Sequence, residues 1–294
     1  PGVRVNLPSI TLKDIKDIDF AIKHKADFIA LSFVREASDV DQLREILKAQ
    51  NSSIKIIAKI ENQEGLDNIH QISQCADMIM VARGDLGIET NLADLPNIQR
   101  RIMYASAKWG ARSIVATHLL ESMIDNPTPT RAEVTDVANA IYEGADAIML
   151  SGETSIGKYP IQCVQMLKEI SERTEEYKTL GYEEHLLAET DWQNIAIAAK
   201  NLAEGIQADG IIAITRSGRT ANVIANTKPT NLRVFCFTNN KATYQQLSIM
   251  GSMHGFYIKN LANQSVALKK IQSTIKKLVK SEKREYKFIL ISGI

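Results

Sequence analysis

The chain has 294 residues, of which 45% are hydrophobic and 23% are charged, as in an ordinary globular protein. Its formal net charge of +1 gives no electrostatic reason to expect nucleic acid or an anionic membrane surface as a partner. The length exceeds that of one ordinary domain, so we expect two domains.

Cysteine usage and hydropathy indicate the compartment. Cys75, Cys163 and Cys236 are far apart and odd in number, which predicts three buried thiols in a reducing compartment instead of a disulfide framework or a metal site. No apolar run approaches the roughly 18 residues of a membrane helix, and no charged and apolar leader opens the chain. We therefore expect a cytoplasmic protein without membrane or nucleic-acid partners.

The first part of the chain alternates short apolar runs with helical patterns, which is typical of βα units and a parallel sheet. Helices are expected at residues 12–25, 40–47, 66–72, 134–141 and 161–177. Strands are expected at residues 27–34, 54–60, 78–82, 113–116 and 147–150. These strands are continuously apolar, as expected when both faces of a sheet are covered.

A short repeat supports this organisation. Ala-Asp-x-Ile occurs at residues 26–29, 76–79, 145–148 and 208–211, each time between an expected helix and an expected strand. Chance recurrence of common residues is the alternative explanation. The matching position in four units favours a repeated βα architecture.

The chain divides at a polar stretch without clear periodicity, residues 179–191, which we interpret as a linker between residues 1–178 and residues 192–294. The C-terminal region is expected to contain helices at 193–205, from 220, at 241–249 and at 265–279, and strands at 210–215, 233–237 and 288–294. This is the pattern of a small doubly wound α/β domain.

The strand count of the first domain is low for its architecture. A closed parallel (β/α) barrel of the TIM type has eight strands, and about five are recognisable here. The expected fold is therefore an incomplete parallel barrel followed by a smaller doubly wound α/β domain. Position 1 is Pro and the chain stops within an apolar run, so we expect that both ends are cut and that this chain alone is inactive.

Active sites of parallel α/β barrels gather at the carboxyl ends of the strands. The residues at these predicted ends are Lys59, Glu61, Arg83, Gly84, Asp85, Thr117, His118, Ser151 and Glu153. Such a set is more polar than strand ends need for structure alone. It predicts a site that handles charged groups.

The first pair of this set is Lys59 and Glu61, which are two residues apart and so point to one face of a strand. In one interpretation, Glu61 holds a hard divalent cation and Lys59 neutralises phosphate charge. A stabilising ion pair at the strand tip is the alternative.

The next strand runs into Arg-Gly-Asp-Leu-Gly at residues 83–87, which predicts a tight turn with backbone N–H groups free to bind an anion. Asp85 is then the second predicted metal ligand. A glycine turn with a capping Asp is the structural alternative. Helix capping equally explains Thr117 and the glycine turn at residues 151–154.

Five motifs together resemble the pyruvate kinase family in order and spacing, at residues 59–62, 80–87, 129–133, 136–140 and 149–154. The resemblance covers residues 1–178 and, more loosely, the rest of the chain. It implies phosphoryl transfer from phosphoenolpyruvate to ADP, giving pyruvate and ATP in glycolysis. It also implies a need for magnesium or manganese and for potassium.

The resemblance assigns roles to individual residues. Lys59 and Thr117 are the catalytic residues it implies, with Lys59 stabilising the transferring phosphoryl group. Glu61 and Asp85 are the implied metal ligands, and Gly84, Asp85 and Thr117 the implied holders of the pyruvate carboxylate. Arg83, Ser151 and Glu153 form a second tier on the same face. These roles suit a loose phosphoryl transition state, which needs positioning and charge neutralisation.

The sequence also departs from the family pattern. His118-Leu119 follows Thr117 where the family commonly has Gln-Met, and Thr90 stands where Pro is usual. We interpret His118 as a tolerated change beside the site. Potassium ligands, part of the phosphate grip, the lid domain and a C-terminal tail are expected outside this chain. The resemblance further implies a homotetramer.

The C-terminal domain contains a second candidate site in a strand-to-helix loop. Its residues are Thr215, Arg216, Ser217, Gly218, Arg219 and Thr220. Hydroxyls, a glycine and two arginines at a helix start can hold a phosphate. The loop resembles the one that binds a sugar-phosphate activator in regulated pyruvate kinases. An ordinary capped turn is the alternative.

Two other functions remain open from the residues alone. A metal-dependent aldolase or lyase that stabilises the pyruvate enolate would share Glu61 and Asp85 but would not need Lys59. A non-catalytic scaffold that binds phosphorylated metabolites is the third hypothesis. Pyruvate formation from phosphoenolpyruvate that requires ADP separates the kinase from the aldolase or lyase, and an intact site in the full-length parent would argue against the scaffold.

Overall fold

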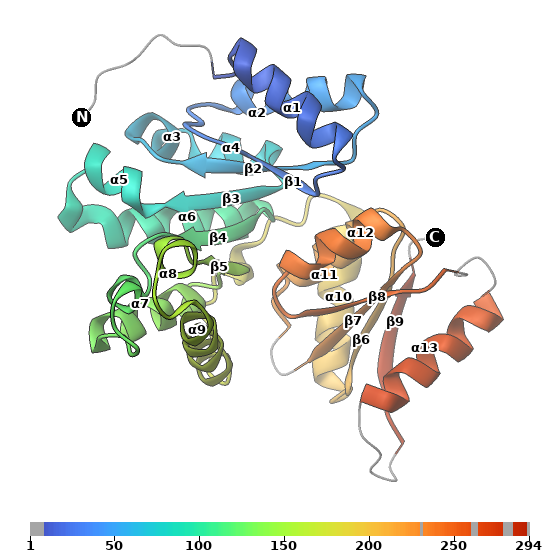
Figure 1. The fold of residues 1–294 in the computed structure, drawn as a ribbon. Helices are drawn as coiled ribbons and strands as arrows, with labels where there is room; N and C mark the ends of the chain where they lie inside the picture. Colours follow the sequence, from blue (N-terminus) through green and yellow to red (C-terminus); the bar gives the residue numbers. More distant parts are fainter. Residues whose placement is uncertain (1–8, 230–231, 260–263, 279–284, 293–294) are drawn as a thin grey trace. The chain divides into compact units, whose positions relative to one another are not determined.

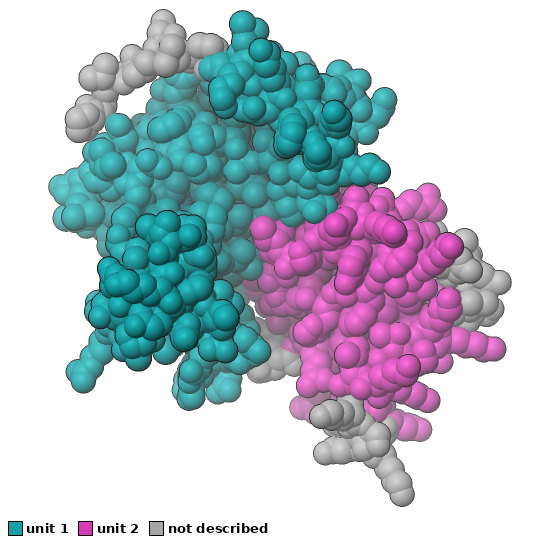
Figure 2. All heavy atoms as spheres, viewed as in Figure 1, with its two compact units in different colours: residues 1–187 teal, residues 188–294 magenta. Residues whose placement is uncertain are grey.

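The computed structural model describes residues 9–229, 232–259, 264–278 and 285–292. The chain divides into two compact units, residues 1–187 and 188–294, which Figure 2 shows in two colours. The ends of two expected elements, residue 279 of a helix and residues 293–294 of a strand, lie outside the described residues. The boundary between the units falls within the stretch 179–191.

Unit 1 is built on one parallel sheet in which strands follow each other in chain order, β1-β2-β3-β4-β5 (Figure 1). The strands are β1 (Phe28–Leu31), β2 (Lys55–Ile60), β3 (Met78–Ala82), β4 (Arg112–Ala116) and β5 (Ala147–Met149). All four pairings are parallel, as expected for consecutive βα units. Five parallel strands in an open sheet confirm the expected incomplete barrel.

Helices lie before, between and after these strands in the chain. They are α1 (Leu12–Lys23), α2 (Ala37–Ala49), α3 (Gln63–Asp67), α4 (Ile69–Cys75), α5 (Arg83–Glu89), α6 (Leu95–Trp109), α7 (Arg131–Tyr142), α8 (Gly152–Ser155) and α9 (Pro160–Thr174), with 3₁₀ turns η1 (Leu92–Asp94), η2 (Glu121–Ile124) and η3 (Tyr182–His185). The helix expected over 66–72 is divided at Asn68, which ends α3 and begins α4. A capping box begins α7, since Thr130 and Glu133 cap each other's backbone N–H.

The two faces of β2 have different surroundings. Ile56, Ala58 and Ile60 are fully buried in the main core of unit 1, together with helix residues such as Leu43 and Ile69. Because strand side chains alternate, Lys59 points to the opposite face. The local sequence therefore directs a charged side chain away from the helix-covered face of the sheet.

The Asp of the Ala-Asp-x-Ile repeat fixes strand starts. The Asp77 carboxylate accepts a hydrogen bond from the backbone N–H of Ile56 at 3.0 Å. The Asp146 carboxylate accepts one from the backbone N–H of Ser113 at 2.9 Å. In unit 2 the Asp209 carboxylate accepts Lys287 N–H at 2.8 Å. Each Asp thus satisfies a donor near the start of a neighbouring strand, where the regular ladder has not yet begun. These bonds lie at the amino ends of the strands, away from the candidate site, and serve stability.

Unit 2 carries a second parallel sheet in the order β8-β7-β6-β9. Its elements are α10 (Asp191–Gly205), β6 (Gly210–Ile214), α11 (Arg219–Asn226), β7 (Arg233–Thr238), α12 (Lys241–Gln246), η4 (Leu247–Ile249), β8 (Met253–Tyr257), α13 (Gln264–Leu278) and β9 (Phe288–Ser292). The strand β8 is not predicted from the sequence, because His254 and Gly255 interrupt its apolar run. Separate core clusters involve the two faces of β6, since Ile211 belongs to one and Ile212 to the other. This agrees with the expected doubly wound arrangement.

The described part of the chain has no helix long and apolar enough to cross a membrane. All three cysteines are free thiols, as expected. Cys163 and Cys236 are buried, whereas Cys75 is only half-buried, which corrects the expectation of three buried thiols. Burial raises the pKa of Cys75 to about 11 and that of Cys236 to about 12.

These thiols should react slowly in the folded protein. The thiolate is the nucleophile, so a raised pKa leaves little reactive form near neutral pH. We expect iodoacetamide at pH 8 to label Cys75 and Cys236 at least ~10-fold more slowly in the native protein than in the same protein unfolded in urea. Peptide mass spectrometry after timed quenching measures both rates. Equal native and unfolded rates would contradict the burial of Cys236.

Candidate active site

The carboxyl end of β2 brings Lys59 and Glu61 into an ion pair, with Nζ 2.6 Å from Oε1. Glu61 is almost fully buried at 1% exposure, while the Lys59 side chain keeps 25%. The Lys59 ammonium also donates to Ser32 Oγ at 3.2 Å, and Phe33 N–H donates to Glu61 Oε2 at 2.6 Å. The two side chains therefore share one face, as their spacing predicts, and both contact the segment that follows β1.

Ser32 and Phe33 are site residues that the sequence analysis missed. The expected strand 27–34 ran through them, but β1 ends at Leu31 and Phe33 has a left-handed backbone with φ 52°. This early ending turns Phe33 N–H toward Glu61. The apolar run continues to Val34, so hydropathy alone gives no signal for the true end of the strand.

The residues after β3 form a helix and not the predicted tight turn. Arg83–Glu89 is the short helix α5, and Gly84 N–H is not free, because it donates to Thr117 Oγ1 at 2.9 Å. The turn prediction was therefore wrong, although it located the residues next to Thr117 correctly. The Asp85 side chain is exposed, and within the described residues no hydrogen bond or ion pair involves its carboxylate.

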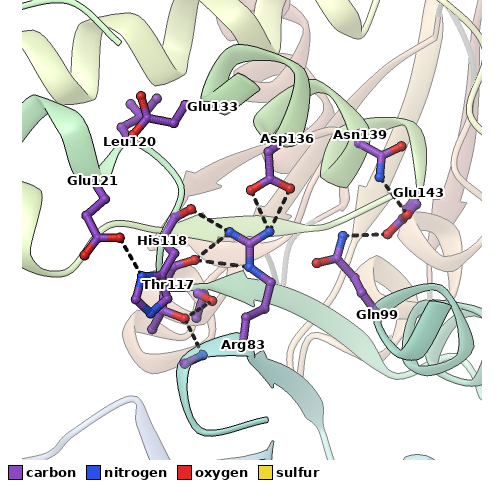
Figure 3. A network of polar contacts seen from close by, with 12 residues as sticks. Arg83, Gln99, Thr117, His118, Leu120, Glu121, Glu133, Asp136, Asn139 and Glu143 are labelled. Carbon is purple, nitrogen blue, oxygen red and sulfur yellow. Dashed lines mark hydrogen bonds and ion pairs between the residues drawn. The ribbon is translucent and has the colours of Figure 1, made fainter. Parts of the chain in front are cut away.

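Thr117 and His118 follow β4 with left-handed backbones, φ 72° and 53°. Such a conformation costs about 1–3 kcal/mol at each non-glycine residue and is most unusual for a β-branched one. Arg83 binds both of their carbonyl oxygens, and Asp136 of α7 binds Arg83 in turn (Figure 3). Arg83 is thus buried in a network under the loop after β4.

The rest of this loop is bound by carboxylates. Glu133 of α7 accepts Ser122 N–H at 2.7 Å, and Glu153 accepts the backbone N–H groups of Leu120 at 3.2 Å and Ser151 at 2.8 Å. Burial opposes ionisation of Glu133, but donors on Ser122 and Thr130 lower its pKa overall. The interactions of ionised Glu133 therefore stabilise the fold fully above pH 4.5, the ordinary pKa of a glutamate. This stabilisation is lost as the pH falls through the lowered pKa of Glu133 in the folded protein. Glu153, placed by the sequence on the site's second tier, is a buried backbone acceptor.

His118 lies beside Gly84 at the surface of the same loop. Its Nδ1 is 2.7 Å from Glu121 Oε2, and both side chains are more than half exposed. A Cβ built on Gly84 would lie 3.4 Å from His118 Nε2 and 3.6 Å from Thr117 Oγ1. The space next to Gly84 is therefore bordered by an imidazole and a hydroxyl.

The motif at residues 136–140 has a structural explanation. Asp136 pairs with Arg83, while Val137 and Ala140 are fully buried in the core of unit 1. Asn139 donates to Glu143 at 3.1 Å, and Gln99 of α6 donates to the same carboxylate at 2.8 Å (Figure 3). Burial raises the pKa of Glu143. One helix thus connects α6, the core and the loop after β4.

A divalent cation suits the donors here, although no group of three or more His, Cys, Asp or Glu side chains capable of holding a metal occurs among the described residues. Mg²⁺ is commonly held by one or two carboxylates, with substrate and water completing its shell. Glu61 and Asp85 follow adjacent strands, since Ile60 of β2 pairs with Val81 of β3. Asp85 offers an exposed carboxylate, and Glu61 a buried one whose Oε1 lies 2.6 Å from Lys59 Nζ.

The candidate effector loop of unit 2 splits into buried and exposed residues. Thr215 and Thr220 are buried, and Thr215 Oγ1 accepts Gly218 N–H at 3.0 Å. Gly218 is the N-cap of α11 with φ 85°, a value that favours glycine. The exposed residues are Arg216, Ser217 and Arg219. Two guanidinium groups and one hydroxyl therefore face solvent around the start of α11.

Unit 1 is a domain of the parallel α/β-barrel class, with basic, acidic and hydroxyl groups at the carboxyl ends of its strands. Residues 1–164 match the family described as "Pyruvate kinase, barrel domain", and residues 193–294 match "Pyruvate kinase, alpha/beta domain". The chain belongs to the pyruvate kinase family.

Individual relatives agree. Pyruvate kinases of Staphylococcus aureus strains MRSA252 and USA300 are each 45% identical over 254 residues, which is 85% of this chain and 43% of the relative. The crystal structure of a pyruvate kinase from Cryptosporidium parvum matches with a TM-score of 0.94 and 34% identity, over 100% of this chain and 62% of that one. The chain therefore spans less than half the length of the curated relatives it matches.

Proposed function

We propose that the complete gene product transfers the phosphoryl group of phosphoenolpyruvate to ADP, giving pyruvate and ATP. One observation carries this proposal: the Lys59–Glu61 pair ends β2, while the next two strands bring Gly84 N–H and the Thr117 hydroxyl within 2.9 Å of each other. Membership of the pyruvate kinase family supports it. An aldolase or lyase is not favoured by these relatives.

In the proposed mechanism, the Lys59 ammonium contacts the transferring phosphoryl group. It stabilises the negative charge that the phosphoryl oxygens carry in the transition state. Glu61 keeps that ammonium oriented, since the two are 2.6 Å apart. Gly84 N–H and Thr117 Oγ1 are the proposed donors for the carboxylate of phosphoenolpyruvate. To donate, Gly84 N–H must leave Thr117 Oγ1, 2.9 Å away, and the hydroxyl must leave Ala116 O, 2.6 Å away. Thr117 is therefore the second proposed catalytic residue, because it fixes the reacting carbon skeleton.

Glu61 and Asp85 are the proposed ligands of Mg²⁺ or Mn²⁺. The bound cation would neutralise phosphate charge and stabilise the enolate that precedes pyruvate. A requirement for K⁺ is also part of the proposal, on the basis of family membership. A second tier of the proposed site supports these groups and consists of Arg83, Ser151 and Glu153. Arg83 and Glu153 bind backbone atoms of the loop after β4.

The activity is tested with the complete gene product and a lactate dehydrogenase coupled assay. NADH oxidation should require phosphoenolpyruvate, ADP and Mg²⁺ together, and replacing K⁺ by Na⁺ should lower the rate. Pyruvate formation without ADP would instead support the lyase. Absence of turnover together with measurable binding of phosphoenolpyruvate would support a non-catalytic scaffold.

The loop of unit 2 is proposed to bind a phosphate of a sugar-phosphate activator through Arg216, Ser217 and Arg219. Replacing Arg219 by Glu should raise the concentration of fructose bisphosphate that gives half-maximal activation by about 10- to 100-fold, since it removes one charged donor and adds repulsion. Lys276, exposed on α13, provides the control Lys276→Glu. Identical activation curves for parent and Arg219→Glu leave the loop as an ordinary capped turn.

The oligomeric state and the location belong to the same proposal. We infer a homotetramer in the cytoplasm, on the basis of family membership and the free thiols. Sedimentation velocity of the purified gene product measures the first, and fractionation of the producing cells the second.

A further inference from the structure

The loop after β4 contains a conformation that its own sequence does not favour. Thr117 and His118 are consecutive non-glycine residues with left-handed backbones, φ 72° and 53°. Residues in this region persist only where the surrounding structure holds them. Thr117 lacks the short polar side chain of Asn or Asp that favours this region by local hydrogen bonding, and its branched Cβ disfavours the region further. The groups that hold Thr117 must therefore come from elsewhere in the fold.

The holding group is the Arg83 side chain. Its Nε and Nη2 donate to the carbonyl oxygen of Thr117 at 3.1 and 2.6 Å, and Nη2 also donates to that of His118 at 3.0 Å. Only 7% of this side chain is exposed. Both carbonyls of the strained segment thus bind one guanidinium group, which lies beneath the loop (Figure 3).

Asp136 fixes the guanidinium from the opposite side. Both of its carboxylate oxygens accept from Nη1 of Arg83, at 2.8 and 2.7 Å. Asp136 lies on α7, whose neighbouring residues Val137 and Ala140 are fully buried. The position of the guanidinium is therefore set by the core of unit 1, through a charge-assisted contact.

The same arrangement determines where the Thr117 hydroxyl lies. Thr117 Oγ1 donates to Ala116 O at 2.6 Å and accepts Gly84 N–H at 2.9 Å. Two adjacent residues therefore contact Thr117. The Arg83 side chain binds its carbonyl oxygen, and the Gly84 backbone N–H binds its hydroxyl oxygen. If the guanidinium were released, the carbonyls would lose their donors, and the backbone of Thr117 would relax toward commoner conformations, which moves the hydroxyl.

We propose that Arg83 and Asp136 are positioning residues that hold the Thr117 backbone, and with it the Thr117 hydroxyl beside Gly84 N–H, at the place where the substrate carboxylate binds. The inference rests on the proposed function and assigns Arg83 no contact with the substrate. It gives Asp136, which the sequence shows only within a motif, a defined role in the site.

A matched control exists at the amino end of β4, the strand that Thr117 follows. Arg112, at the start of β4, pairs with Asp146 at 3.0 Å, and both side chains are 2% exposed. This pair has the same chemistry and at least equal burial, but it lies at the amino end of β4, away from Thr117. Loss of either pair should destabilise unit 1, whereas only loss of the Arg83–Asp136 pair should disturb the substrate site.

The test compares Asp136→Asn with Asp146→Asn in the complete gene product. We expect Asp136→Asn to raise KM for phosphoenolpyruvate about 10- to 100-fold with kcat changed less than about threefold, because a binding group common to ground and transition states is displaced. Asp146→Asn should lower Tm at least as much yet leave KM within about twofold. Equal KM values for the two variants would overturn the proposal.

A double-mutant cycle tests the route through Thr117. In a Thr117→Ala background, adding Asp136→Asn should change KM by less than about twofold, since the hydroxyl to be positioned is gone. A full additive increase would contradict the proposal. If Asp136→Asn does not fold, Arg83→Lys replaces it, which keeps a cation beside Asp136 but loses the fork to the two carbonyls. A parent without ADP-dependent pyruvate formation would refute the proposed function itself, whereas an active parent with unaltered Arg83→Lys kinetics would refute only this inference.

Discussion

Replacing Lys59 by Met should reduce turnover by about 10²- to 10⁴-fold while the protein stays folded, because a cationic contact to the transition state is removed from a sheltered site. Lys59 is the cation that contacts Glu61, and its side chain is 25% exposed, so it can reach a bound phosphoryl group. Methionine preserves the unbranched aliphatic chain. The expected loss is therefore one of charge.

The substitution also leaves the Glu61 carboxylate without its cation, although Phe33 N–H still donates to it at 2.6 Å. We expect this to destabilise the fold by about 1–3 kcal/mol, which a domain of ordinary stability tolerates. Urea unfolding followed by circular dichroism measures this loss, and the coupled assay measures kcat.

Lys55 provides the control for Lys59. It is on the same strand and face, four residues earlier, and pairs with Asp77 at 3.0 Å. Lys55→Met should change kcat by less than about twofold, since its pair lies at the amino end of β2. If Lys59→Met kept turnover within threefold of the parent, Lys59 would have no part in the phosphoryl transfer.

The fold could be predicted from the sequence because its signals are local and repeated. Five apolar runs gave five parallel strands, and the Ala-Asp-x-Ile repeat marked four helix-to-strand junctions. The strand β8 was missed because its stability comes from pairing with β7 and not from its own composition. Tertiary pairing outweighs weak strand propensity at an edge strand.

The candidate site was predictable in its residue types but not in its backbone. Lys59 and Glu61 share a face because of strand periodicity, which a sequence contains directly. The early end of β1, the helix α5 and the left-handed Thr117 depend on bonds from Glu61, Thr117 Oγ1 and Arg83. Those partners are 28 to 34 residues apart in the chain. Such long-range bonds leave no periodic signal.

Arg83 shows the limit most clearly. Its place directly after β3 suggested a group facing the site, yet it is 6% exposed and its donors bind Asp136 and two backbone carbonyls. Position at a strand end is therefore a good guide to which residues gather. It is a poor guide to which of them point toward a substrate and which support the others.

The second prediction of large effect concerns the other proposed metal ligand. Asp85→Ala should abolish metal-dependent turnover, because Glu61 alone cannot hold a hard divalent cation well at neutral pH. The exposed Asp85 carboxylate has no protein partner within the described residues, so its removal should change the free energy of unfolding by only about 0.5 kcal/mol. Loss of activity could then not be attributed to unfolding.

Manganese binding tests whether Asp85 is a metal ligand without relying on turnover. Electron paramagnetic resonance of free Mn²⁺, titrated into the complete gene product, should show a loss of affinity on the order of 10²-fold for Asp85→Ala, since even an outer partner of a ligand contributes 10- to 100-fold. Asp94, an exposed carboxylate in the turn after α5, supplies the control Asp94→Ala, which should leave affinity and turnover unchanged. Unaltered Mn²⁺ affinity in Asp85→Ala would show that Asp85 is not a ligand, and the site would then have to hold its cation through Glu61 and the substrate.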